Sequence, residues 1–219
     1  MTRRSLATLL WLLSFGIVFL WSAIAPFDRL TWALEVAPAM IGLAVLAATR
    51  TRFPLTPLVY WLILGHAIIL MAGGHYTYAR EPFFSWLRDT FDLARNHYDR
   101  LGHLAQGFVP ALVAREILLR RSPLVRGKWL FFIVASICLA ISACYEFIEW
   151  WVALAIGINA EEFLGIQGDV WDTQTDMFLA LVGAVTALCT LHRVHDCQLA
   201  QLPKEKYRGT TVAKGRRKR

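Results

Sequence analysis

The sequence has too few charged residues for an ordinary soluble domain. Only 18% of its 219 residues are charged, whereas 57% are hydrophobic, and soluble domains carry about 25% charged residues on average. Cysteine is equally sparse, and the four cysteines show neither a short metal-binding pair nor the pattern of a secreted disulfide framework. These shortages exclude a disulfide scaffold and favour a membrane protein.

Six apolar runs are long enough to be considered as membrane spans. A hydrocarbon core about 30 Å thick needs roughly 20 mostly apolar residues per helix, and isolated strands would leave backbone groups unpaired there. We therefore predict an all-α fold, a polytopic helical bundle of six transmembrane helices. It forms a single integral membrane domain over residues 1–200, followed by a basic cytoplasmic tail over 201–219. The runs are Leu6–Ala25, Trp32–Ala48, Leu58–Ala72, His103–Leu119, Trp129–Trp151 and Asp176–Leu191.

The first run could be read as a cleaved signal peptide, because it follows Arg3 and Arg4 and ends in "SAIAP". Its apolar stretch is longer than the 7–15 residues of a signal core. Trp11 and Trp21 lie near its ends, where interfacial anchors are expected. These features favour a retained helix.

The basic residues indicate an orientation. Six spans place all but five of the 23 Lys and Arg residues on one side, and only three of the 16 acidic residues there. Short cytoplasmic loops retain Lys and Arg, so we expect a bacterial inner-membrane protein with both termini in the cytoplasm. The net charge of +7 then follows from topology. The tail "KGRRKR" is expected to contact anionic membrane lipids and no nucleic acid.

The longest connection, between the third and fourth runs, contains an amphipathic pattern. Four apolar residues recur at helical spacing with charged residues on the opposite side, which is typical of a helix lying in the membrane interface. Such a helix could cover a cavity or serve only as an anchored connector. The apolar residues are Phe84, Leu87, Phe91 and Ala94, and the charged ones Arg88, Asp89, Asp92 and Arg95.

Polar residues gather at the predicted outer ends of the last three spans. Asp99, His103 and Gln106 stand at i, i+4 and i+7, so a helix places them in one sector. Glu146 and Glu149 share a face of the fifth helix. The motif "GDVWDTQTD" adds three aspartates at i, i+3 and i+7 before the sixth run, if the helix begins that early: Asp169, Asp172 and Asp176.

A divalent cation is the simplest common partner for these groups. An acid near the bilayer centre costs about 2.5–3.5 kcal/mol on insertion scales and needs compensation, and clustered carboxylates repel one another. Glu149 or Asp169 is expected to act as a second ligand or as the general base. The predicted metal ligands are Asp99, His103, Glu146, Asp172 and Asp176.

Each of these residues also has a simpler interpretation. The aspartates before the sixth run would complement the positive end of a helix dipole, and Asp99 could pair with Arg95 or Arg100. His66 is expected to be a hydrogen-bonded packing residue, and Glu161 and Glu162 solvated loop acids.

The blocks "NHYDRLGHLAQGFVPALVAREILLR", "YEFIEWW" and "FLGIQGDVWDTQTDM" resemble the YjdF-like inner-membrane family of bacteria, whose biochemical role is not established. The match covers most of the chain from the second run onward. The arrangement is more loosely similar to VanZ-like membrane proteins, with Asp99, His103, Glu146, Asp172 and Asp176 at the matching positions. That likeness implies action on the cell envelope, although the residues around Asp169 and Asp172 depart from the VanZ-like pattern.

The sequence thus leaves three functions open, and with them whether the protein is an enzyme. The first is a metal-dependent enzyme of the outer leaflet that acts on a lipid-linked or envelope substrate, with Mn²⁺, Fe²⁺ or Zn²⁺ suited to the ligands. The second is a transporter whose acids line an ion pathway. The third is a noncatalytic membrane partner in which polar residues fix helix packing. The oligomeric state stays open.

Overall fold

The protein was analysed as a computed structural model, which describes residues 3–157 and 167–202. All regular structure in these ranges is helical, with no strand among the described residues, so the all-α prediction is confirmed. The basic tail from residue 203 and the loop acids Glu161 and Glu162 lie outside the described residues. The helices are α1 (Arg3–Ala23), α2 (Arg29–Thr49), α3 (Pro57–Tyr76), η1 (Tyr78–Arg80), α4 (Pro82–Phe91), α5 (Tyr98–Arg121), α6 (Lys128–Ile156) and α8 (Asp172–Ala200).

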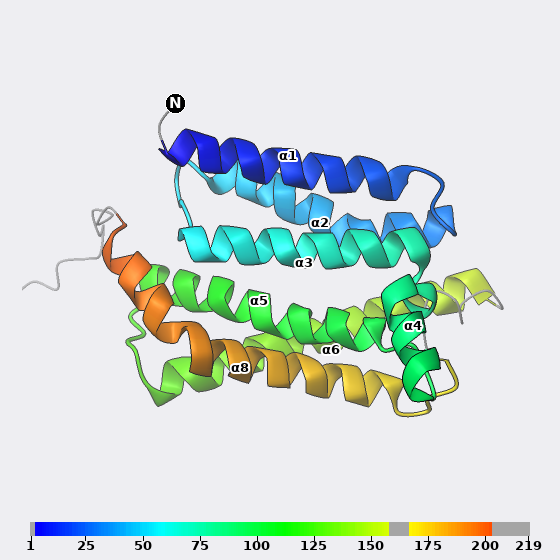
Figure 1. The fold of residues 1–219 in the computed structure, drawn as a ribbon. Coiled ribbons are helices and arrows are strands. Elements are labelled where there is room, and N and C mark those ends of the chain that lie inside the picture. Colours follow the sequence, from blue (N-terminus) through cyan, green and yellow to red (C-terminus); the bar gives the residue numbers. More distant parts are fainter. Residues whose placement is uncertain (1–2, 158–166, 203–219) are drawn as a thin grey trace, which may run out of the picture.

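Six long helices run side by side and alternate in direction, with the α1 to α3 group on one side of the α5, α6 and α8 group (Figure 1). Helix α3 contacts α5 and joins the two groups. The alternation brings Arg50, Arg52, Arg121 and Lys128 to one end of the bundle, which we call the basic end. The opposite end, which carries α4 and the N-terminus of α8, is called the acidic end.

Five of these helices, α1, α2, α3, α6 and α8, are long and apolar enough to cross a membrane. Helix α5 is equally long but less apolar, because its buried face carries charged side chains, among them Asp99, Arg115 and Glu116. Neighbouring helices α3, α6 and α8 all pack against α5. Its polar residues therefore face protein, as expected for ionisable groups inside a membrane bundle.

The contact between α5 and α8 is the most extensive in the bundle and depends on small residues. A Cβ atom on Gly107 would lie 1.7 Å from the Ala180 carbonyl oxygen, and one on Gly183 would lie 2.1 Å from the Leu104 carbonyl oxygen. Ala180, Ala184 and Ala187 are fully buried in the same contact. Small residues allow membrane helices to approach this closely, and the approach fixes the relative position of the two helices that carry Asp99, His103 and Asp176.

Helix α4 lies across the acidic end of the bundle (Figure 1). It leaves Phe83, Trp86 and Phe91 more than half exposed. The predicted helical pattern through Ala94 and Arg95 is wrong at its C-terminal end, because Asp92 adopts a left-handed conformation that terminates the helix after Phe91. The chain then turns inward, and Arg95 is buried instead of lying on a solvated face.

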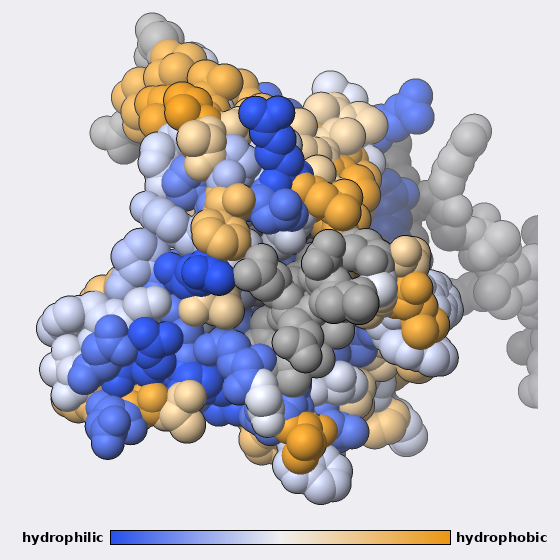
Figure 2. Space-filling model, turned by 90° about the vertical axis from the view of Figure 1, so that its right-hand side faces the viewer, coloured by the Kyte–Doolittle hydropathy of each residue, from blue (hydrophilic) through white to orange (hydrophobic). Residues whose placement is uncertain are grey.

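Figure 2 shows this acidic end face. Hydrophilic side chains cover much of it, and hydrophobic residues lie mainly toward its edges. Buried polar residues lie at the same end, at the N-termini of α5 and α8, among them Asp99, His103, Asp172 and Asp176. The fold therefore places a group of buried polar residues at the acidic end of the bundle.

The close approach of α5 and α8 generates a first prediction. Gly107→Ala is expected to destabilise the fold by about 1–3 kcal/mol, because the added methyl meets backbone atoms that cannot move aside without separating the helices. Thermal unfolding in detergent measures the effect. Gly65→Ala is the matched control, since a Cβ atom there has nothing within 4 Å, and it should be neutral or slightly stabilising. Equal melting temperatures for both variants would contradict the packing argument.

Candidate metal and carboxylate site

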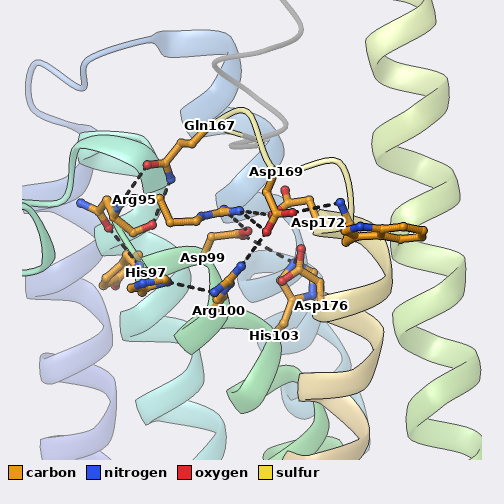
Figure 3. A network of polar contacts seen from close by, with 12 residues as sticks. Arg95, His97, Asp99, Arg100, His103, Gln167, Asp169, Asp172 and Asp176 are labelled. Carbon is orange, nitrogen blue, oxygen red and sulfur yellow. Dashed lines mark hydrogen bonds and ion pairs between the residues drawn. The ribbon is translucent and has the colours of Figure 1, made fainter. Parts of the chain in front are cut away.

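The buried guanidinium of Arg95 lies among carboxylates from the first turn of α5 and from the segment where α8 begins. Its side chain is only 4% exposed, and Nη1 contacts Asp172 at the first turn of α8. Nη1 also lies 3.5 Å from Asp169 Oδ2, and Nη2 lies 3.6 Å from Asp99 Oδ2. Figure 3 shows Arg95 reaching between Asp99, Asp169 and Asp172. One cation thus joins the starts of α5 and α8.

Asp169 is held by further donors in the turn before α8. It accepts a hydrogen bond from Arg100 Nη2 at 2.7 Å and another from the Trp171 backbone N–H at 2.9 Å. The Trp171 hydrogen bond, together with Arg100 and Arg95, holds the pKa of Asp169 below its usual range. This carboxylate is therefore ionised at neutral pH.

The Asn96 backbone and the Gln167 side-chain amide join the same two segments by a pair of hydrogen bonds. The Asn96 N–H donates to Gln167 Oε1 at 2.9 Å, and Gln167 Nε2 donates to the Asn96 carbonyl at 3.0 Å. Asn96 is fully buried, and its side-chain amide also donates to the Glu81 carbonyl at the start of α4. The connections that precede α4, α5 and α8 are thereby joined at the acidic end. These hydrogen bonds hold the starts of α5 and α8, and with them the site residues, in place.

His103 lies directly beneath the arginine cluster. Its Nε2 atom is 3.5 Å from Asp99 Oδ1 and 3.9 Å from Asp176 Oδ2, and all three residues are buried. One ligand atom from each lies within 4.8 Å of the others, so the Asp99–His103–Asp176 group could hold a metal ion. The other ring nitrogen, Nδ1, lies 3.3 Å from Gln106 Oε1 and 3.8 Å from Glu146 Oε1.

Several carboxylate oxygens in this site are buried without a donor. Among the described residues, none donates a hydrogen bond to Asp176 Oδ1 or Glu146 Oε1. A buried polar atom left without a partner costs about 1–3 kcal/mol, and a charged one costs more. Glu149, one turn further along α6, is also buried. This excess of oxygen ligands over donors is the arrangement that a cation would stabilise.

The predicted site residues thus separate into two groups. Asp99, His103 and Asp176 lie together, and Glu146 approaches His103 from the side facing away from that pair. Asp172 and Asp169 face the arginines instead. The suggestion that Asp99 pairs with an arginine is confirmed for Arg95. The ligand roles of Glu146 and Asp172 and the base roles of Glu149 and Asp169 stay predictions.

Glu35 on α2 was missed by sequence reasoning, although it is only 1% exposed. The hydroxyl of Tyr145 on α6 donates to Glu35 Oε2 at 3.5 Å, one residue before Glu146 in the chain. Glu35 is the only acid within its apolar run, and no acid or histidine lies three or four residues from it to suggest a site. Its position inside the second run was the one available signal, because an intramembrane acid is functional by default.

A second buried polar cluster lies at the basic end. Glu116 accepts from the Thr56 hydroxyl at 2.8 Å and from Arg120 at 2.7 Å, and its Oε2 lies 3.0 Å from His195 Nε2. Arg115 Nη1 lies 3.1 Å from the remaining His195 nitrogen. Both carboxylate oxygens of Glu116 have partners. This cluster therefore connects α3, α5 and α8 and lacks the unpartnered oxygens of the acidic end.

The apolar helices, the buried charged groups and the all-helical bundle define a polytopic integral membrane protein. Residues 7–197 match the family described as "Predicted membrane protein (DUF2238)", and the chain belongs to that family. It is 54% identical over 188 residues to "Inner membrane protein YjdF" of Escherichia coli (strain K12), which covers 85% of this chain and 90% of that protein. The relationship and the apolar helices support a bacterial inner-membrane location. No solved structure matches the chain.

The Arg95 cluster generates a second prediction. Arg95→Gln leaves buried carboxylates without their cation, and breaking a buried ion pair in this way costs about 3–5 kcal/mol. Thermal unfolding in detergent should show a large loss of stability.

Arg88→Gln is the matched control, because Arg88 pairs with Asp89 on the surface. Exposed pairs contribute about 0–1 kcal/mol. A melting temperature for Arg95→Gln as high as that of the control would show that the cluster does not hold the two helix starts together.

Proposed function

We propose that this protein is a membrane-embedded enzyme that binds a divalent cation through Asp99, His103 and Asp176. The proposal rests on one observation: one imidazole and two carboxylates converge within 4.8 Å in a buried site, next to carboxylate oxygens that accept no hydrogen bond from any described residue. Mixed carboxylate and imidazole ligands suit Mn²⁺, Fe²⁺ or Zn²⁺. A bound ion of this kind lowers the pKa of a coordinated water, which makes hydrolysis at neutral pH feasible.

The surrounding residues support this role. Gln106 lies within hydrogen-bonding distance of His103 Nδ1, and a partner on that nitrogen orients the ring so that Nε2 faces the two aspartates. Glu146 and Glu149 supply carboxylates on the α6 side, where either could accept a proton from water. Arg95 positions Asp99 relative to α8 by its contact with Asp172. The chain thus provides ligands, an orienting group and a proton acceptor.

The position of the site suggests the class of substrate. In this proposal α5 also spans the membrane, in addition to the five apolar helices. The excess of basic residues at the opposite end then makes the acidic end the outer one. Helix α4, with Phe83, Trp86 and Phe91 exposed, then lies in the outer interface beside the site. A substrate that reaches this depth from the outer leaflet is lipid-linked or part of the cell envelope.

An ion pathway is the alternative, because buried charged groups occur at both ends of the bundle. The contact between α5 and α8 argues against it. Gly107 and Gly183 bring backbone atoms together between the two polar clusters, which leaves no room for water along this helix pair. The enzyme is therefore the function that the geometry supports best.

Metal analysis tests the proposal. Purified protein should contain close to one transition-metal ion per chain, and His103→Ala and Asp176→Asn should each remove it, because a site with three protein ligands does not survive the loss of one. Elemental analysis by mass spectrometry measures the ratio after dialysis against a weak chelator.

Two further variants make the test specific. Asp172→Asn should retain more metal than Asp176→Asn, because Asp172 faces Arg95. Asp89→Asn, at an exposed residue, should retain all of it. Protein that binds no ion when Mn²⁺, Fe²⁺ or Zn²⁺ is supplied, or His103→Ala protein that still binds one, would refute the proposal.

A further inference from the structure

A separate cavity of about 500 Å³ lies between α1, α2, α3 and α5. Its walls are almost entirely apolar, with Trp11 from α1, Ala39 and Gly42 from α2, and Val113 from α5. It shares no residue with the Asp99–His103–Asp176 group. We call this cavity the α2/α5 groove.

The groove is long and narrow. On α5 its lining runs from Val109 to Arg121, and on α2 from Pro38 to Thr49, which at 1.5 Å per residue corresponds to roughly 17 Å. That length is about half of a hydrocarbon core 30 Å thick. The groove therefore extends from the basic end to about the bilayer midplane, the depth of one leaflet.

The cross-section limits what the groove can hold. A volume of about 500 Å³ spread over this length leaves a mean cross-section of roughly 30 Å², whereas an α-helix with its side chains is about 10–12 Å across. A helix from a second copy or from another protein is too wide. A single hydrocarbon chain is narrow enough.

The basic end of the groove is cationic. Arg121 and Phe53 line it, and the guanidinium groups of Arg120 and Arg121 lie 3.7 and 4.9 Å from the centre of the Phe53 ring. Arg50 ends α2 beside Thr49 and donates to Thr8 at 2.9 Å. The lining includes no acidic residue. Because Arg120 is paired with Glu116, an anionic group at this end meets the charge of Arg121 in the lining and that of Arg50 beside it.

From this combination we infer that the α2/α5 groove binds an anionic phospholipid, with one acyl chain in the groove and the phosphate beside Arg121. Basic pockets between membrane helices bind anionic lipid head groups in this way. The binding is independent of the proposed enzyme, because the groove opens at the other end of the bundle.

Trp11 provides a direct readout, since it is buried in the groove wall. The full chain is reconstituted in nanodiscs of phosphatidylcholine containing increasing fractions of phosphatidylglycerol with brominated acyl chains, which quench tryptophan on contact. The Trp11 contribution is the difference between wild type and Trp11→Phe. We expect it to be quenched at low fractions of brominated phosphatidylglycerol, before brominated phosphatidylcholine has any comparable effect.

Two pairs of variants distinguish the contribution of the lipid's acyl chain from that of its head group. Gly42→Leu fills the groove without a clash, because a Cβ atom there meets nothing within 4 Å, and it should abolish Trp11 quenching. Gly65→Leu, at a glycine that is equally open but outside the groove, should not. Arg121→Gln should raise the half-quenching fraction of phosphatidylglycerol about fivefold, whereas Arg193→Gln, at the same end but outside the groove, should leave it unchanged.

Size-exclusion chromatography and circular dichroism verify that each variant is folded. If Gly42→Leu does not fold, Val113→Phe serves as the second groove-filling variant, because Val113 also lines the groove. Equal quenching of Trp11 by the two brominated lipids would overturn the proposal. So would wild-type quenching in both groove-filling variants, or native mass spectra showing a second copy or a peptide bound in place of a phospholipid.

Discussion

The structure depends on how one buried arginine is neutralised. Arg95 lies in the connection just before α5, and its guanidinium contacts Asp99 in the first turn of α5 and Asp169 and Asp172 at the start of α8. A buried charge is tolerated only when it is paired and hydrogen-bonded, so these segments must meet where they do. Their meeting places Asp99, His103 and Asp176 within reach of one another. The contact of Gly107 with Ala180 then continues the alignment of the two helices toward the basic end.

The two ends of the bundle differ in how completely their buried carboxylates are hydrogen-bonded. At the basic end, Glu116 is surrounded by Thr56, Arg120 and His195, and both of its oxygens have partners. At the acidic end, carboxylates outnumber the donors, and Asp176 Oδ1 and Glu146 Oε1 are buried without one. Structural polar networks are normally complete, since an incomplete one is costly. The basic-end cluster is therefore a complete network among the described residues, whereas the acidic end leaves buried oxygens without a donor, which is why the proposed cation site lies there.

Much of this could be predicted from the sequence, because apolar run length and helical spacing are local properties. The six long helices and the shared face of Asp99 and His103 follow from them. The pairing of Asp172 with Arg95 does not, since it depends on where the chain turns after Asp92 adopts a left-handed conformation. Glu35 was missed for a related reason: its hydrogen-bond donor Tyr145 lies on another helix, α6, and spacing along one helix cannot indicate it.

The central claim is that groups distant in the sequence form a common coordination sphere. X-ray absorption spectroscopy of protein loaded with one equivalent of Zn²⁺ or Mn²⁺ tests it most directly. The account predicts oxygen and nitrogen ligands at about 2.0–2.2 Å, with the scattering pattern of one imidazole that disappears in His103→Ala. A first shell of oxygen alone, identical in wild type and His103→Ala, would mean that the ion binds elsewhere and that these side chains gather for structural reasons.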